Sequence, residues 1–123
     1  MKSVYEYIWQ DHKGNFRSKT KVTNNLFRNI TDNEDAIWNY DGSSTEQAPG
    51  SDSEVYIKPI AIYKDPFRKT GLGMKNAFHN YYLVLCDTWL PSGEPHPDNH
   101  RARCKHIFDN KKVIDEEPMF GIE

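Results

Sequence analysis

The stretch of apolar residues at 81–89 constrains the fold of this chain more than any other feature of its sequence. It reads Tyr-Tyr-Leu-Val-Leu-Cys-Asp-Thr-Trp, without the polar alternation of a strand that has one face in water. A continuous apolar run of this length is typical of a strand that is covered on both faces. We therefore expect residues 81–89 to form a central strand of a sheet.

Further strands are predicted on the N-terminal side of this one. Residues 4–9 are rich in β-forming residues, residues 11–15 have turn chemistry, and residues 16–22 alternate as a second strand would. Together they predict a hairpin. Residues 54–63 predict another strand, in which Pro59 marks an edge, a bend or a bulge because it has no N–H to donate to a strand ladder.

The C-terminal part of the chain predicts one helix. A turn-rich linker at 91–97 is followed by Asp98 or Asn99, whose side-chain oxygen is suited to cap a helix that runs to about Asp109. Residues 119–123 have the pattern of an opening strand. Polar loops separate the other elements, at 23–36 and 41–53. Many strands with one late helix indicate a small α+β domain, with a boundary near the linker.

The charge balance excludes several classes of partner. Sixteen Lys and Arg stand against 18 Asp and Glu, for a net charge of -2, and the mean hydropathy is -0.85. This is not the electrostatic footprint of a nucleic-acid-binding protein. The basic run at 17–21 can contact phosphates, but it is more typical of a solvated strand face. No stretch approaches the ~20 apolar residues of a membrane span, so neither nucleic acid nor a membrane is an expected partner.

The N-terminus and the two cysteines indicate a cytoplasmic protein. Residues 1–7 lack the apolar segment of a signal peptide. Cys86 lies in the apolar run and Cys104 in a polar helical segment. Free thiols are the better expectation for such a pair, although a disulfide between them stays open.

Two sets of residues have both a functional and a structural interpretation. His96, His100 and Cys104 recur at a spacing of four, so the last two share a helix face and allow a metal site. An exposed helix surface is the better explanation. Several aromatic residues resemble a binding cage, but core packing or an interface explains them better: Trp9, Trp38, Tyr56, Phe67 and Trp89.

A family resemblance becomes visible at residues 38–44, which read Trp-Asn-Tyr-Asp-Gly-Ser-Ser. This segment resembles the aromatic-Asp-Gly-Ser-Ser signature of glutamine synthetases of the eukaryotic type, and residues 52–57 fit the continuation of that pattern. The resemblance extends, in the right order, through further segments: 7–9, 17–20, 64–68, 83–87, 97–101 and 117–123. Several ordered matches are more specific than one tetrapeptide.

The resemblance implies a fold and a reaction. It implies a β-grasp (ubiquitin-like) domain at residues 1–93, followed at 94–123 by the beginning of the catalytic domain, with one helix and a terminal strand. The chain would cover about the first third of a family member. Glutamine synthetases use ATP, with Mg or Mn, to ligate ammonia to glutamate. None of these cofactors is expected to bind this chain alone.

The signature also implies an ammonium site. In the family the Asp of this loop, here Asp41, binds ammonium and removes its proton, and the second Ser, here Ser44, accepts a hydrogen bond from it. Gly42 is suited to a tight backbone path between them. The family's loop enters the active site of the neighbouring subunit, so the implied partners are other glutamine synthetase subunits.

Two further carboxylates match functional positions of the family. Asp65 matches a residue that helps to hold a mobile loop of the adjacent chain, although it can equally cap the turn before Pro66. Glu123 matches the first Glu of a metal-binding segment, but divalent cations require several oxygen ligands, and one carboxylate is not a metal site. Small departures from the family pattern occur at Gln10 and His12.

Two functions from different classes remain open at this point. In the first, the chain is part of a glutamine synthetase polypeptide, and it is not expected to catalyse the ligation alone because further ligands, the nucleotide pocket and the substrate-binding arginines would follow Glu123. In the second, the chain is a non-catalytic module that docks on a full-length glutamine synthetase and regulates or poisons its assembly.

Overall fold

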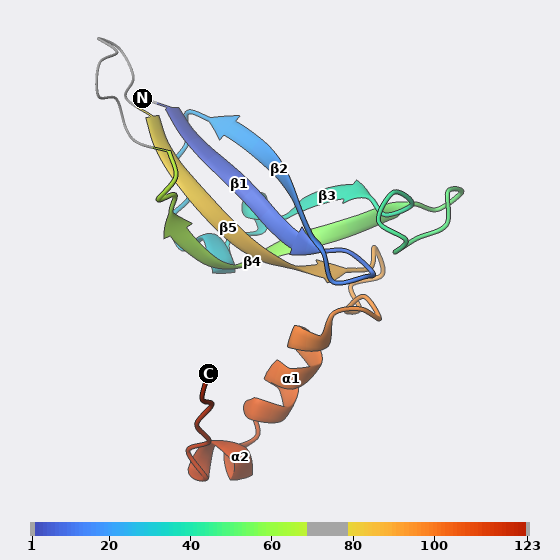
Figure 1. Ribbon diagram of the computed structural model, residues 1–123, viewed down its shortest axis with the longest axis vertical. Helices are drawn as coiled ribbons and strands as arrows, with labels where there is room; N and C mark the ends of the chain where they lie inside the picture. Colours follow the sequence, from blue (N-terminus) through green and yellow to red (C-terminus); the bar gives the residue numbers. More distant parts are fainter. Residues whose placement is uncertain (1, 69–78, 123) are drawn as a thin grey trace.

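A computed structural model describes residues 2–68 and 79–122 of the chain (Figure 1). Five strands form one mixed sheet in the order β2-β1-β5-β4-β3. They are β1 (Lys2–Gln10), β2 (Phe16–Thr23), β3 (Trp38–Asp41), β4 (Glu54–Lys64) and β5 (His79–Trp89). β1 and β5 pair in parallel, and the other neighbours pair antiparallel. The predicted α+β class is confirmed, and the arrangement is consistent with a β-grasp-like domain.

The position of β5 confirms the expectation that its apolar sequence forms a central strand. β5 lies between β1 and β4 and pairs with both along most of its length. Val84 and Cys86 point into the core and are buried, whereas Leu83 and Leu85 on the opposite face are only half-buried. The expected cover is therefore complete on one face of β5 and partial on the other.

Aromatic rings fill the covered face of the sheet. Tyr5 and Tyr7 are fully buried, and the Tyr7 hydroxyl donates a hydrogen bond of 2.7 Å to the carbonyl of Ala36. Three ring pairs have centroid separations of 5.2, 5.4 and 4.5 Å: Tyr5–Tyr82, Tyr7–Trp38 and Trp9–Tyr40. Such pairs stabilise a core beyond the area they bury. Residues 24–37 close this face with two 3-10 turns, η1 (Ile30–Asp32) and η2 (Glu34–Ala36), within the predicted polar loop.

A bulge in β4 confirms the special role of Pro59. β3 pairs with β4 only as far as Ile57, so Pro59 lies where β4 has lost its neighbour on that side. The register between β4 and β5 shifts between Pro59 and Ala61, as a residue without a backbone N–H favours. β3 itself was not predicted, because it has only four residues and its sequence resembles that of the loop beside it.

Two helices follow the sheet and extend away from it (Figure 1). They are α1 (His100–Phe108) and α2 (Lys111–Asp115), and neither contains a buried residue. Asn99 caps α1 by accepting a hydrogen bond from the Ala102 amide, as predicted. The second helix, α2, was not predicted. It begins after Asn110, whose side chain accepts a hydrogen bond from the Lys112 amide and caps the new helix.

The prediction of a strand at residues 119–123 is wrong for the residues of that segment that the structure describes. Residues 117–122 have no regular secondary structure. A strand is stabilised by a hydrogen-bonding neighbour. Here the segment follows α2 and lies away from the described sheet (Figure 1). Neither of the helices in the described ranges is long and apolar enough to cross a membrane.

Candidate functional site

The connection between β3 and β4, residues 41–53, is called the Asp41 loop here. Asp41 is the last residue of β3, its side chain is exposed, and it lies directly opposite Glu54 in the β3–β4 register. Like charges in opposite positions of an antiparallel pair repel each other. The amide of Asn39 relieves part of this repulsion by donating a hydrogen bond of 2.9 Å to Glu54. This arrangement favours a cation close to the two carboxylates.

Ser43 holds the Asp41 carboxylate in place and in its charged form. Its hydroxyl and its backbone N–H both donate to Asp41 Oδ1, at 2.6 and 2.9 Å. These two bonds, the hydroxyl first, hold the pKa of Asp41 below its usual value. Asp41 is therefore ionised at neutral pH, which is the state that attracts a cation.

Ser44 is arranged as a hydrogen-bond acceptor. Its hydroxyl donates its proton to the backbone carbonyl of Asp41 at 3.0 Å, and the side chain is exposed. A hydroxyl whose proton is committed in this way still has lone pairs on its oxygen. Ser44 is consequently suited to accept a bond from a ligand that donates, such as an ammonium ion.

Gly42 lies at the point where the loop is most tightly folded. Its N–H donates to the carbonyl of Ser53 at 2.6 Å, and its carbonyl accepts from the amides of Thr45, Gln47 and Ala48 at 3.3, 2.8 and 3.1 Å. A Cβ at this position would lie 2.5 Å from a methyl group of Val55. The sequence predicted a glycine for a tight path, and the physical reason is lack of space rather than a positive φ angle.

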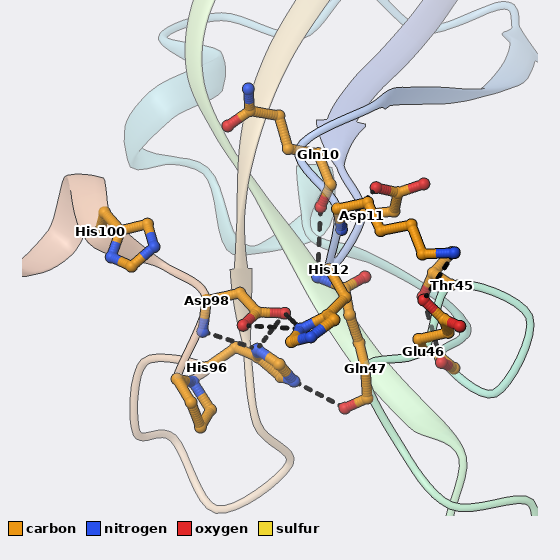
Figure 2. Close-up of polar contacts among 12 residues, drawn as sticks. Gln10, Asp11, His12, Thr45, Glu46, Gln47, His96, Asp98 and His100 are labelled. Atoms are coloured by element: carbon orange, nitrogen blue, oxygen red, sulfur yellow. Dashed lines mark hydrogen bonds and ion pairs between the residues drawn. The ribbon is translucent and has the colours of Figure 1, made fainter.

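Gln47 fastens the Asp41 loop to the rest of the fold (Figure 2). Its side-chain oxygen accepts from the buried hydroxyl of Tyr40, and its Nε2 donates to the carbonyl of Gln10 at 3.1 Å. Its backbone carbonyl receives a bond of 2.6 Å from the imidazole of His96. Neither Gln47 nor His96 was predicted in these roles, because an isolated Gln in a polar loop carries no sequence signal for such contacts.

The β1–β2 turn, residues 11–15, supports the same loop from the other side. Asp11 is buried and accepts bonds from the amides of Lys13 and Asn15, both at 2.9 Å, and from Arg17 Nε at 3.0 Å. The amide of His12 then donates to the carbonyl of Thr45 at 3.2 Å. The loop that carries Asp41 is therefore braced by β1, by the turn and by the segment before α1.

Comparison with known proteins gives a consistent result over almost the whole chain. The sequence is 49% identical over 122 residues to the chloroplastic/mitochondrial glutamine synthetase of Arabidopsis thaliana, a match that covers 98% of this chain and 26% of that protein. It is 46% identical over 122 residues to a cytosolic isozyme of Daucus carota and 47% identical over 123 residues to glutamine synthetase PR-1 of Phaseolus vulgaris. The chain is related to the N-terminal region of glutamine synthetases.

This relationship confirms the family resemblance carried by residues 38–44. No protein-family model matches the chain. The chain spans about a quarter to a third of the length of the glutamine synthetases it matches. Those relatives include chloroplastic and cytosolic isozymes, so the relationship does not fix a compartment, and the cytoplasmic location stays a prediction.

Asp65 lies far from Asp41, at the opposite end of β4. Its side chain is 3% exposed, accepts a bond of 2.8 Å from the Phe67 amide and lies 3.5 Å from Arg68 Nε. This geometry is that of a residue that caps the turn around Pro66. The role toward an adjacent glutamine synthetase subunit stays a prediction. Glu123, the predicted metal ligand, lies outside the described residues.

The other candidate residues do not form a site in the described part of the chain. His100 and Cys104 are exposed on α1, and His100 Nδ1 contacts Arg103. Within residues 2–68 and 79–122 no group of three or more His, Cys, Asp or Glu is placed to hold a metal ion. Cys86 and Cys104 are both free, as expected. Among the candidate aromatic residues, Trp9 is buried in the core, whereas Phe67 is 85% exposed and belongs to no described core.

The basic run at 17–21 is partly a packing feature. Lys19 and Lys21 lie over the ring of Trp38, with their ammonium nitrogens 3.7 and 4.7 Å from its centroid. Lys19 also donates to the carbonyl of Asn39 at 2.7 Å. Cation–π contacts of this kind hold β2 against β3, across the covered face of the sheet. These lysines are therefore less solvated than the sequence suggested.

Proposed function

We propose that this chain is the N-terminal part of a glutamine synthetase polypeptide and that its Asp41 loop supplies the ammonium site of a neighbouring subunit. The observation that carries the proposal is the state of Asp41. Its carboxylate is exposed, ionised and fixed by Ser43 at the point where a braced loop leaves β3. In this proposal residues 1–93 form the β-grasp domain and residues 94–123 begin the catalytic domain.

The chemistry of the ligation explains why such a carboxylate is useful. Ammonium is the abundant form of the nitrogen donor at neutral pH, but it has no lone pair and cannot attack an acyl phosphate. A carboxylate attracts the cation first and then accepts a proton from it as the nucleophile forms. A lowered pKa favours the first task, so Asp41 acts chiefly as the electrostatic partner that concentrates ammonium. Ser44 orients the ion by accepting a hydrogen bond from one of its N–H groups.

The exposed position of Asp41 supports a site that is shared between polypeptides. The Asp41 carboxylate and the Ser44 hydroxyl both lie on the surface. The acyl phosphate would have to be presented to them from outside, by a second subunit that binds glutamate and ATP. Mg or Mn requires several oxygen ligands. The described residues bring no such set together, so no step through a metal is assigned to this chain.

Complementation of a defective enzyme tests the proposal. A full-length glutamine synthetase whose own loop Asp is replaced by Ala is mixed, under conditions of subunit exchange, with this chain or with its Asp41→Asn variant. We expect glutamine formation to be restored by the chain and not by the variant. A Glu46→Gln variant is a matched control, because Glu46 is exposed in the same loop and has only a 3.5 Å ion pair with Lys13. Equal restoration by the chain and by Asp41→Asn would contradict the assigned role.

The isolated chain is expected to make no glutamine from glutamate, ATP and ammonium. Asp41 and Ser44 account for one half-site only. The measurement is glutamine formation by the purified chain, with the full-length enzyme as positive control. Turnover above background would show that the site is not shared.

A second function is supported by the completeness of the loop. The backbone of the Asp41 loop has several internal bonds around Gly42 within this chain, so its conformation does not require the rest of a subunit. A chain that occupies the place of a loop but brings no substrate pocket would act as a regulator or poison of glutamine synthetase assembly. Titration of an intact enzyme with the chain distinguishes the two functions. Loss of activity at a 1:1 ratio supports the regulator, and unchanged activity with no complex by native mass spectrometry excludes it.

A further inference from the structure

The segment that leads into α1, residues 95–99, is attached to the end of β5. Pro95 forms a bridge with Trp89, and the amide of His96 donates to the carbonyl of Thr88 at 3.1 Å. The side chain of Asn99 donates to the same carbonyl at 2.8 Å while it caps the helix. The base of α1 therefore has a fixed position relative to the sheet.

The hydrogen bonds of His96 define its tautomer. The ring is buried, with 5% exposure, and Nδ1 accepts a bond of 3.1 Å from the backbone amide of Asp98. Because an N–H can donate only to a lone pair, the proton of the neutral ring is on Nε2. That nitrogen lies 2.6 Å from the carbonyl of Gln47 and donates to it. Both ring nitrogens are used, one in each role.

Asp98 and His12 close the arrangement on its outer side (Figure 2). Nδ1 of His12 lies 3.1 and 3.2 Å from the two carboxylate oxygens of Asp98. The same carboxylate lies 3.7 Å from His96 Nδ1. Two imidazoles and a carboxylate are ligand types that zinc accepts, but the lone pair of His96 Nδ1 is already used by an amide N–H. The cluster therefore acts as a hydrogen-bonded clasp between the β1–β2 turn and the base of α1.

The clasp continues into the Asp41 loop. The backbone carbonyl of Gln47 accepts the bond from His96, and the backbone N–H of Gln47 donates to the carbonyl of Gly42 at 2.8 Å. Only two hydrogen bonds thus separate the imidazole of His96 from the residue that follows Asp41. A displacement at the base of α1 that moves His96 would break its hydrogen bond to the Gln47 carbonyl.

We propose that His96 is a positioning residue that couples the base of α1 to the Asp41 loop. When α1 is held in its present place, the His96–Gln47 bond adds to the bonds that Gln47 makes with Tyr40 and Gln10 and stabilises the loop closed around the Gly42 carbonyl, and displacement of α1 makes opening of the loop more frequent. This coupling rests on the proposed function only in that it concerns the same loop, to which ammonium binding is assigned. The test of the coupling measures loop closure in this chain and involves no ammonium chemistry. The coupling and the proposed ammonium site can therefore fail independently of each other.

Amide hydrogen exchange at Gln47 and Ala48, followed by NMR on the whole chain, measures loop closure. His96→Gln retains a side-chain N–H near the position of Nε2, whereas the shorter His96→Asn does not reach Gln47. We expect His96→Asn to speed exchange by about three- to tenfold, the range for loss of one hydrogen bond, and His96→Gln to stay within about twofold of the original. His106→Asn, on the exposed surface of α1, is the matched control and should change nothing. Equal acceleration by both His96 variants would show that His96 only fills space and would overturn the proposal.

A double-mutant cycle tests the coupling itself. Asn99→Ala removes the cap of α1 and its bond to Thr88, so it should accelerate exchange at Gln47 in the original chain and have little further effect in His96→Asn. Additive effects of the two changes would mean that no coupling passes through His96. The tautomer is tested without any substitution, by the 15N chemical shifts of the imidazole. A proton on Nδ1 rather than Nε2 would refute the proposal even if the variants failed to fold.

Discussion

Replacement of Gly42 by alanine should destabilise the protein through crowding alone. The new methyl group would lie 2.5 Å from Val55 Cγ2, 3.0 Å from the Ala48 Cβ and 3.2 Å from the carbonyl oxygen of Ser53. Val55 is fully buried, and its branched side chain has little rotational freedom with which to give way. The backbone must therefore shift, which weakens the 2.6 Å hydrogen bond from Gly42 N–H to Ser53.

The magnitude follows from three opposing effects. Overpacking of a buried site costs about 1–3 kcal/mol, and a weakened backbone bond adds up to about 1 kcal/mol. Alanine also reduces the freedom of the unfolded chain, which returns about 0.4–1 kcal/mol because the φ angle of Gly42 is not positive. These ranges sum to a net loss of unfolding free energy of about 0–3.6 kcal/mol, with about 2 kcal/mol at their midpoints. For a domain of this size the midpoint corresponds to a fall in Tm of roughly 8 °C.

Guanidinium and thermal unfolding, followed by circular dichroism, measure this loss, and Gly50→Ala is the matched control. A Cβ at Gly50, in the same loop, meets no atom within 4 Å and its φ is not positive, so that variant should be neutral or slightly stabilised. A Val55→Ala change removes the clashing methyl group, so the double variant with Gly42→Ala should be less damaged than the sum of the single changes. If Gly42→Ala unfolded within about 0.5 kcal/mol of Gly50→Ala, the argument from space would be refuted.

Three further predictions test the charge, the core and the thiols. Ser43→Ala should raise the pKa of Asp41, as measured by an NMR titration of its carboxyl carbon. Because the pKa of Asp41 is lower in the folded than in the unfolded state, the ionised carboxylate stabilises the fold at pH values above the unfolded-state pKa. This stabilisation is lost as the pH falls through the folded-state pKa. No upward movement would mean that Ser43 does not hold the charge. Tyr7→Phe should cost about 1–3 kcal/mol in denaturant unfolding, since it leaves a buried carbonyl without its donor, and an unchanged midpoint would contradict that. Cys104 should react with iodoacetamide in the native protein, whereas Cys86 should react only on unfolding, because burial raises its pKa to about 12. Prompt native labelling of Cys86 would refute the described packing of β5.

The parts of the fold that could be predicted from the sequence are those with strong local patterns. The strands at 4–9, 16–22, 54–63 and 81–89 all appear, close to their predicted limits, since apolar patterning and turn residues dictate them. An irregularity at Pro59 and a cap at Asp98 or Asn99 were predictable because each follows from the chemistry of single residues, and the structure selects the bulge and Asn99.

The parts that could not be predicted depend on contacts between distant segments. β3 exists because β4 offers it an edge, and the 119–122 segment forms no strand because it has no such edge among the described elements. For the candidate site, the motif indicated Asp41 and Ser44 by resemblance, and the structure places both on the surface of one loop. The residues that hold that loop, Gln47 and His96, are 49 positions apart, and only the folded chain brings them together.

The parallel pairing of β1 with β5 has a consequence for how the protein is made. Lys2 pairs with His79, 77 positions later, so β1 lacks one neighbour after its synthesis until most of the described sheet has been translated. At typical rates of about 5–20 residues per second, that interval lasts roughly 4–15 seconds. During it the nascent β1–β2 hairpin presents an unpaired edge, a known template for aggregation. Nascent chains arrested before residue 79 should therefore bind chaperones that protect exposed strands, and release them once β5 has emerged.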